Sequence, residues 1–83
     1  MNVVNPQGLH ARPISSFVKL SATFAAKVTV RGPGGVADGR SVLSMMGLNA
    51  PAGSELEIRA AGSDAALALA ALVELVRGGF GEA

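Results

Sequence analysis

The chain has 83 residues, with no cysteine, no tryptophan, no tyrosine and a single histidine. The lack of cysteine excludes disulfides and thiolate metal ligands, and one histidine cannot build a transition-metal site by itself. The lack of cysteine also agrees with a reducing compartment. Aromatic residues make up only 4%, all of them phenylalanine, whereas nucleic-acid-binding modules need stacking aromatics. We therefore expect no metal, no cofactor and no nucleic-acid partner.

Charged residues and long apolar runs are scarce as well. Charged residues are 16% and hydrophobic residues 49%, a composition typical of a globular rather than a disordered chain. The longest apolar stretch, residues 65–73, is too short to span a bilayer, and no secretory signal is visible. We expect one domain over residues 1–83, a monomer located in the cytoplasm without membrane insertion.

The few charges are unevenly distributed. Residues 1–50 hold five basic groups and one acidic group, whereas residues 51–83 hold two basic and five acidic groups. The half that carries the histidine is thus positive, which favours acidic docking partners.

The most informative segment that is present is Gly8–Pro13, which holds the histidine, His10. Proline belongs in the first turn of a helix, and the amides just before it then face outward at the positive end of the helix dipole. Such a terminus binds anions, and the guanidinium of Arg12 matches phosphate oxygens. Histidine is a nucleophile that is partly neutral near pH 7. The segment predicts a phosphoryl site, and the alternative is an ordinary surface histidine beside a helix start.

Hydrophobic periodicity predicts seven elements in the order β-α-β-β-α-β-α. The first helix should bury a stripe of Ile14, Phe17, Leu20 and Phe24, and the last helix a stripe of Ala65, Leu69, Leu72 and Val76. The expected elements are a strand over Met1–Asn5, a helix from Pro13, strands over 27–31 and 36–37, a short helix after Ser41, a strand over 55–60 and a helix from 63–64 to about Arg77. Helices on only one face indicate an α+β open-faced sandwich.

Three segments resemble the HPr phosphocarrier family of the phosphoenolpyruvate-dependent phosphotransferase system. They are Gly8-Leu9-His10-Ala11-Arg12-Pro13, Arg40-Ser41-Val42-Leu43-Ser44-Met45-Met46-Gly47-Leu48, and Leu72–Leu75 continued by Gly79–Glu82. They lie in the family order and spacing. The resemblance implies a four-stranded antiparallel sheet with three helices on one face.

The resemblance also implies roles for the first motif. His10 would accept a phosphoryl group from enzyme I and pass it to the IIA domains of sugar permeases. Arg12 would stabilise the phosphoryl charge, the amides of Ala11 and Arg12 would hold its oxygens, and Pro13 would set the helix start. The chain would be a carrier of the phosphoryl group rather than a stand-alone catalyst.

Ser41 is predicted to cap the short helix that follows it. In the family a serine kinase phosphorylates this position in many bacteria and weakens transfer to the histidine; the alternative is a capping serine that is never modified. Here Ser44 replaces a glycine often found three positions on, which puts kinase recognition in doubt. The implied partner-docking residues are Ser15, Ser16, Lys19, Val42, Leu43 and Met46.

Two other functions stay open at this point. A nitrogen-related regulatory paralogue shares the histidine signature and the fold. A non-catalytic HPr-like binding module would act only through Ser41, although the presence of His10 argues against it.

Overall fold

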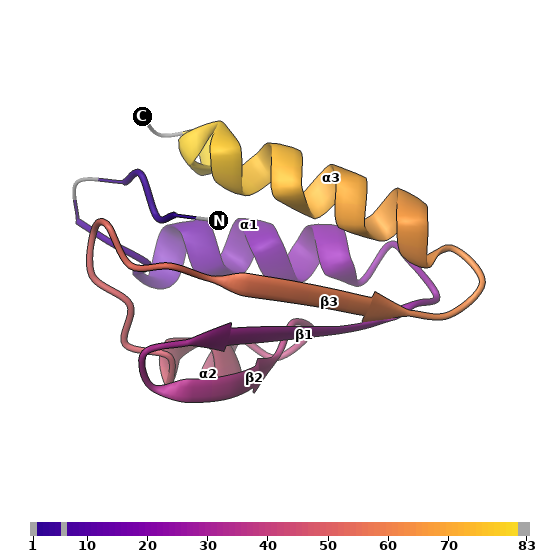
Figure 1. Cartoon of the computed structure of the whole chain (residues 1–83), viewed down its shortest axis with the longest axis horizontal. Coiled ribbons are helices and arrows are strands. Elements are labelled where there is room, and N and C mark those ends of the chain that lie inside the picture. Colours follow the sequence, from indigo (N-terminus) through magenta and orange to yellow (C-terminus); the bar gives the residue numbers. More distant parts are fainter. Residues whose placement is uncertain (1, 6, 82–83) are drawn as a thin grey trace.

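The computed structural model describes residues 2–5 and 7–81. It contains the helices α1 (Ala11–Ser21), α2 (Val42–Met46) and α3 (Ala65–Arg77), with a short 3-10 turn, η1, at Gly79–Gly81. The strands are β1 (Lys27–Gly32), β2 (Gly35–Asp38) and β3 (Glu57–Ala61). Figure 1 shows the three helices arranged around one small sheet.

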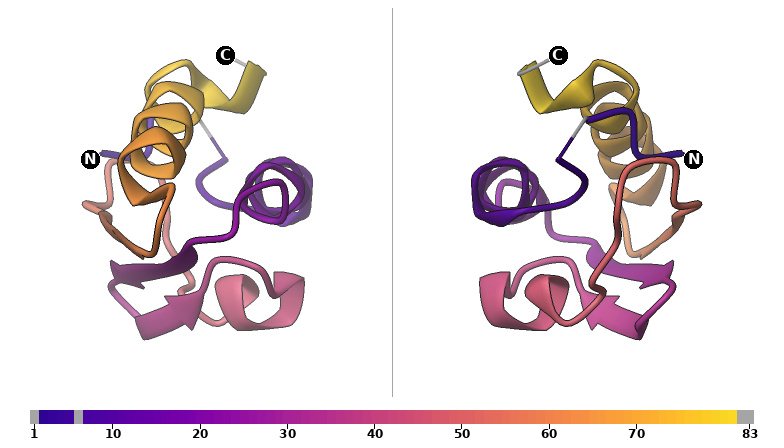
Figure 2. Two further views of the ribbon diagram at one scale, coloured as in Figure 1. Left: turned by 90° about the vertical axis from the view of Figure 1, so that its right-hand side faces the viewer. Right: turned by 90° about the vertical axis from the view of Figure 1, so that its left-hand side faces the viewer.

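The described sheet has three strands in the order β2-β1-β3, and both pairings are antiparallel. In the register, Thr29 lies between Asp38 and Arg59, and Arg31 lies between Val36 and Glu57. Val28 and Val30 alternate with these residues and are fully buried. One face is therefore apolar and packs under the helices, as Figure 2 shows, while the other faces solvent.

The core lies between the sheet and the helices. Its fully buried large side chains include Phe17 on α1, Met45 on α2 and Leu72 on α3. Burying one such side chain contributes roughly 2–3 kcal/mol. The buried hydrophobic residues are Val3, Leu9, Ile14, Phe17, Ala26, Val28, Val30, Ala37, Met45, Leu48, Ala50, Leu56, Ala68, Leu72, Val76 and Phe80.

The prediction of a fourth strand at the N-terminus is wrong for the described residues. Asn2 forms only an isolated antiparallel bridge with Glu55, supported by a 2.8 Å hydrogen bond from the Val3 N–H to the Ser54 carbonyl. The chain then turns inward, because the Asn5 side chain is buried and donates to the Gly79 carbonyl at 2.9 Å. Met1, the first residue of the predicted strand, lies outside the described residues.

The predicted buried faces of the first and the last helix both need correction. Helix α1 ends at Ser21, because the Thr23 hydroxyl and N–H both donate to the Leu20 carbonyl, and Phe24 lies half-buried beyond it. On α3 the buried residues are Ala68, Leu72 and Val76, whereas Leu69 is 37% exposed. The predicted Ala65 is only half-buried.

The remaining predictions of local structure are close to the observed elements. Helix α2 begins after Ser41, whose side chain accepts a hydrogen bond from the Ser44 N–H at 3.1 Å, so the predicted cap is confirmed. Strand β3 begins two residues later and ends one residue later than the predicted strand over 55–60. No helix in the described part of the chain is long and apolar enough to cross a membrane.

Candidate phosphoryl site

The loop before α1 is held by one backbone hydrogen bond within the loop and one to a segment distant in sequence. The Gly8 N–H donates to the Asn5 carbonyl at 2.9 Å, and the Leu9 N–H donates to the Ala50 carbonyl at 2.8 Å. Leu9 is buried, which fixes the side of the loop that faces the core. The next residue, His10, is thereby directed to the surface end of the helix.

Gly8 is required by this geometry. Its φ is +75°, and a Cβ at this position would lie 2.7 Å from the Ala50 carbonyl oxygen and 2.8 Å from the Pro51 Cα. Both atoms belong to the backbone, so neither can move aside easily. Only glycine combines that φ with so close an approach.

His10 is the N-cap residue of α1. Its backbone is extended, with φ −103° and ψ −172°, and its carbonyl accepts the first helical hydrogen bond, from the Ile14 N–H at 3.1 Å. The side chain is half-buried. Helix α1 begins at Ala11, so Pro13 is its third residue, still within the first turn as predicted, and it is buried.

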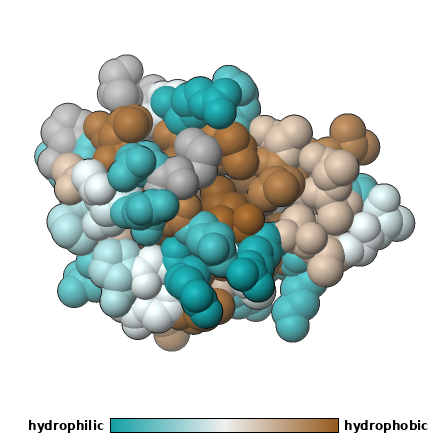
Figure 3. All heavy atoms as spheres, in the orientation of Figure 1, coloured by the Kyte–Doolittle hydropathy of each residue, from teal (hydrophilic) through white to brown (hydrophobic). Residues whose placement is uncertain are grey.

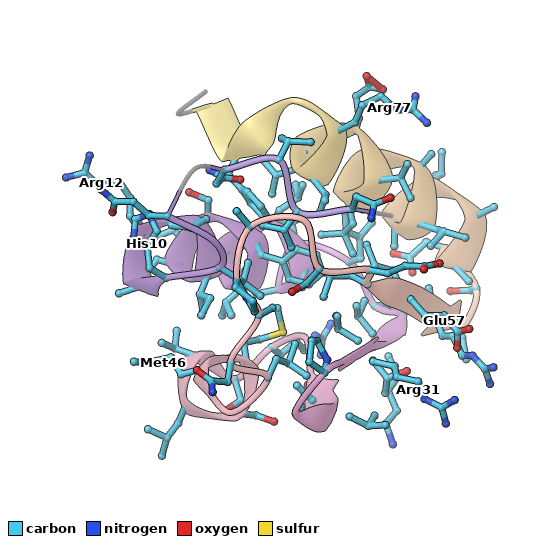
Figure 4. All side chains as sticks on the ribbon, turned by 60° about the vertical axis from the view of Figure 1, so that its left-hand side comes forward. His10, Arg12, Arg31, Met46, Glu57 and Arg77 are labelled. Carbon is cyan, nitrogen blue, oxygen red and sulfur yellow. The ribbon has the colours of Figure 1, made fainter. Side chains whose placement is uncertain are left out.

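The first turn of α1 offers a positive end to an anion. The first N–H groups of an α-helix have no acceptor inside the helix, and proline contributes none. Ala11 and Arg12 are both exposed, and the first turn contains no acidic residue. Figure 4 shows Arg12 projecting outward from the same end of α1 that carries His10. The structure thus places His10 and Arg12 at the same end of α1, at the helix start.

Helix α2 packs beside α1 and carries an exposed apolar group. Val42, Leu43 and Met46 are 38%, 83% and 50% exposed. In Figure 4 Met46 lies below the first turns of α1, on the side of the molecule that carries His10. On α1 itself, Ser15 and Ser16 are half-buried and Lys19 is exposed. The predicted docking residues therefore lie on two adjacent helices.

Ser41 sits at the start of α2 within a small hydrogen-bond network. The Ser44 hydroxyl accepts from the Asp38 N–H at 2.9 Å, and the Asp38 carboxylate accepts from the Arg40 N–H at 2.9 Å. The hydroxyl at position 44, where the family often has glycine, therefore ties α2 to the end of β2. Ser41 itself is half-buried.

Just beyond the opposite end of α1, two backbone amides bind a carboxylate. The two oxygens of Asp64 accept from the Ala25 N–H and the Ala26 N–H, each at 2.8 Å. The hydrogen bond from Ala25, followed by those from Ala26 and Asp64 itself and by the charge of Arg40, lowers the pKa of the Asp64 carboxyl; desolvation acts in the opposite direction.

Sequence reasoning missed the residues that position the site rather than form it. Gly8 was part of the motif, but its positive φ depends on the Ala50–Ala52 loop, which is remote in sequence. Asn5 and Asp64 likewise act through distant backbone groups, on Gly79 and on Ala25 and Ala26. A glycine shortly before a helix cap could have indicated the role of Gly8. No sequence signal indicated the roles of Asn5 and Asp64. The described residues contain no group of three or more His, Cys, Asp or Glu side chains placed to hold a metal ion.

The comparison with known families agrees with the geometry of the α1 start. The model for the PTS HPr component phosphorylation site matches residues 1–78. This chain belongs to the PTS HPr family.

Individual HPr-family proteins cover almost the whole chain. It is 34% identical to the phosphocarrier protein HPr of Neisseria meningitidis over 82 residues, covering 99% of this chain and 92% of that protein. It is 38% identical to the phosphocarrier protein NPr of Proteus mirabilis over 81 residues, covering 96% and 90%. The crystal structure of HPr from Thermoanaerobacter tengcongensis superposes with a TM-score of 0.93 at 31% identity, covering 100% and 93%.

Proposed function

We propose that this protein is a phosphocarrier of the phosphotransferase system and that His10 carries the phosphoryl group. The observation that supports this most is the position of His10 as N-cap of α1, directly before the exposed residues Ala11 and Arg12. This arrangement lies within a chain whose HPr-family match covers residues 1–78. Residues 1–83 would form one domain of that family, acting in the cytoplasm.

The chemistry needs a lone pair on the ring nitrogen nearer the backbone. With the imidazole proton on Nε2, His10 Nδ1 attacks phosphorus, and the bond between phosphorus and the donor atom breaks as the new P–N bond forms. The guanidinium of Arg12 and the amides of Ala11 and Arg12 would stabilise the charge on the phosphoryl oxygens. The same groups would stabilise the phosphoryl group when it arrives and when it leaves. In transfer to an acceptor, an acceptor atom attacks phosphorus and the P–N bond to His10 breaks.

Enzyme I is the proposed donor and the IIA domains of sugar permeases are the proposed acceptors. They would dock on α1 and α2, over Ser15, Ser16, Lys19, Val42, Leu43 and Met46. The nitrogen-related branch is a second candidate, since NPr of Proteus mirabilis is as similar to this chain as HPr of Neisseria meningitidis is. Transfer to IIA proteins of the two branches, measured side by side, distinguishes them.

The deciding experiment is incubation with phosphoenolpyruvate and enzyme I, followed by intact mass and acid-lability measurement. We expect one acid-labile phosphoryl group on the wild type and none on His10→Ala, because His10 is the only histidine. A Ser41→Ala variant is the control and should still gain the acid-labile group. Phosphorylation of the His10→Ala variant to the wild-type level would refute the assignment.

We also propose that Ser41 is a regulatory phosphorylation site. A charge on its Oγ would lie at the N-terminal end of α2, the helix that carries the docking residues Val42 and Met46 and packs against α1. We expect Ser41→Asp to slow phosphoryl transfer from enzyme I, while Ser41→Ala, which loses the cap, costs about 1 kcal/mol of stability and leaves the rate unchanged. Equal transfer rates in Ser41→Asp and the wild type would remove the regulatory role but not the carrier function.

A further inference from the structure

The solvent face of the sheet carries three basic side chains, Lys27 and Arg31 on β1 and Arg59 on β3, and all three are exposed. Figure 3 shows hydrophilic residues at the level of β1 and β3, below the hydrophobic centre of the view. In Figure 4 Arg31 lies on the opposite side of the molecule from His10. Part of the positive charge of residues 1–50 therefore lies away from the candidate phosphoryl site.

The carboxylates of the sheet do not use up these positive charges. In the part of the chain that the structure describes, neither Lys27 nor Arg31 makes an ion pair. Arg59 is paired with Glu57, at 2.8 Å between Nε and Oε1, and its two terminal nitrogens have no acceptor among the described residues. The carboxylate of Asp38, on the same face, already accepts from a backbone N–H. The face can therefore bind further negative charge.

The three cations follow one another at the spacing of alternate residues in an extended chain. In the register of β1 and β3, Thr29 faces Arg59, so Arg59 lies midway between Lys27 and Arg31 along the strand direction. Four residues of a strand span about 13 Å, and the neighbouring strand lies about 4.8 Å to the side, within reach of a long side chain. One small anion cannot contact all three cations. Acidic side chains at positions i, i+2 and i+4 of an extended segment can do so.

A shallow hollow that both arginines line limits what can enter. Its volume is about 110 Å³, and its lining residues are Thr29, Arg31, Val36, Glu57 and Arg59. Pockets for small-molecule ligands usually measure about 300–1,000 Å³, so this hollow takes one side chain rather than a whole ligand. Two arginines and one glutamate leave one net positive charge, which a carboxylate neutralises. Val36 is 64% exposed and can contact the methylene groups of an acidic side chain.

We propose that the solvent face of the sheet docks an extended acidic segment of a partner protein, with carboxylates at alternate positions facing Lys27, Arg59 and Arg31. The carboxylate in the hollow binds the terminal nitrogens of Arg59 and the guanidinium of Arg31. Because these contacts are exposed, the complex is weak and is weakened further by salt. His10 lies on the other side of the molecule, so the segment leaves it accessible. This inference is independent of the proposed phosphoryl transfer.

Amide chemical shifts of the whole protein, titrated with two capped peptides of equal charge, test the proposal. One peptide alternates, Glu-Ser-Glu-Ser-Glu, and the other has the same composition in blocks, Ser-Glu-Glu-Glu-Ser. We expect the alternating peptide to shift the signals of residues 27–31 and 57–61 in a saturable way. It should bind about two- to fivefold more tightly, since the block peptide turns one glutamate away from the sheet. Equal affinities, or shifts confined to Ala11 and Arg12, would overturn the proposal.

Charge reversal separates this site from general attraction between opposite charges. Arg31→Glu should weaken binding of the alternating peptide by about fivefold or more, because an attraction becomes a repulsion. Arg77→Glu is the matched control, since it changes the net charge by the same amount on α3 and should alter the affinity by less than about twofold. Circular dichroism checks that both variants are folded. An equal loss of affinity in the two variants contradicts the proposed site.

Two further titrations test the other possible occupants of this face. If inorganic phosphate saturates the same signals at lower concentration than the alternating peptide, the ligand is a free anion. If the signals of residues 27–31 shift with protein concentration alone, a second copy of the chain occupies the face. Either result overturns the proposal, and we expect neither.

Discussion

The two ends of helix α1 differ: a carboxylate of the chain itself binds the amides just beyond one end, and the other is the helix start at which we propose that a phosphoryl group binds. Beyond the C-terminal end, the carboxylate of Asp64 accepts from the Ala25 and Ala26 N–H groups at 2.8 Å each. At the N-terminal end, the exposed residues Ala11 and Arg12 follow the N-cap residue His10. The chain supplies its own anion beyond the C-terminal end of α1, whereas the N-terminal end is the proposed site at which a phosphoryl group would arrive and leave.

The surroundings of the two ends of α1 also differ: one end is enclosed by contacts within the chain and the other is open to solvent. Ala26 is fully buried, and the guanidinium of Arg40 donates to the Phe24 carbonyl beside it, so this end is locked by contacts within the chain. Ala11 and Arg12 are open to solvent, and Arg12 extends outward. A group that passes between proteins needs electrostatic stabilisation without enclosure, which the exposed N-terminal end of α1 would supply to the proposed phosphoryl group.

The largest expected effect comes from removing the backbone geometry on which the open end depends. Gly8→Ala places a Cβ within 2.8 Å of the backbone of residues 50 and 51 at a φ of +75°. We expect a loss of about 3 kcal/mol or more in the free energy of unfolding, from the left-handed backbone and the steric overlap together. Chemical denaturation followed by circular dichroism measures this loss.

Gly53→Ala separates those two causes. Gly53 also has a positive φ, +85°, but a Cβ there would meet no atom within 4 Å. Only the backbone cost of about 1 kcal/mol should remain. If both variants lose the same stability, the close approach to Ala50 and Pro51 is not what makes Gly8 necessary.

A smaller effect, on transfer rather than stability, is expected from Arg12→Ala. A charge-assisted hydrogen bond contributes about 1.5–3 kcal/mol, so phosphoryl transfer from enzyme I should slow by roughly ten- to a hundredfold. Because Arg12 is exposed, the melting temperature should change little. Arg77→Ala is the control, since Arg77 lies on α3 in a 3.8 Å ion pair with Glu74 and should leave the transfer rate unchanged. A wild-type rate in Arg12→Ala would exclude the guanidinium from the site.

Sequence reasoning located the start of α1 because the determinants of a helix start are local. The order His10, Arg12, Pro13 lies within four residues, and a helix start is a property of one short segment. The cap at Ser41 and the alternation of Val28 and Val30 are equally local, and both are confirmed.

The sequence could not predict the contacts made between distant segments. Asp64 was assigned to the start of the last helix, yet its side chain makes no cap hydrogen bond there and binds amides almost 40 residues earlier. Leu69 has the spacing of a core residue, yet it is 37% exposed, whereas the neighbouring Ala68 is fully buried. Periodicity identifies the face of an element but not the presence of a neighbour.

The contact between Asp64 and the amides beyond the C-terminal end of α1 can be tested with the variant Asp64→Asn. The pKa of Asp64 is lowered in the folded protein, chiefly by the hydrogen bond from Ala25, so its stabilising contribution is present above the unfolded pKa of about 3.9 and is lost as pH falls through the folded value. We expect Asp64→Asn to lower the melting temperature at pH 7. The difference in melting temperature between wild type and variant should be smaller at pH 3. There the wild type has lost part of this contribution, whereas the introduced asparagine side chain does not titrate.

Glu74→Gln provides the matched control for that titration. Glu74 contacts Arg77 at 3.8 Å with both side chains largely exposed, and such pairs add little to stability. Its replacement should shift the melting temperature slightly and by the same amount at both pH values. If the difference in melting temperature between wild type and Asp64→Asn is also the same at both pH values, the carboxylate charge does not stabilise the contact with the Ala25 and Ala26 amides. The two ends of α1 would then differ in exposure alone.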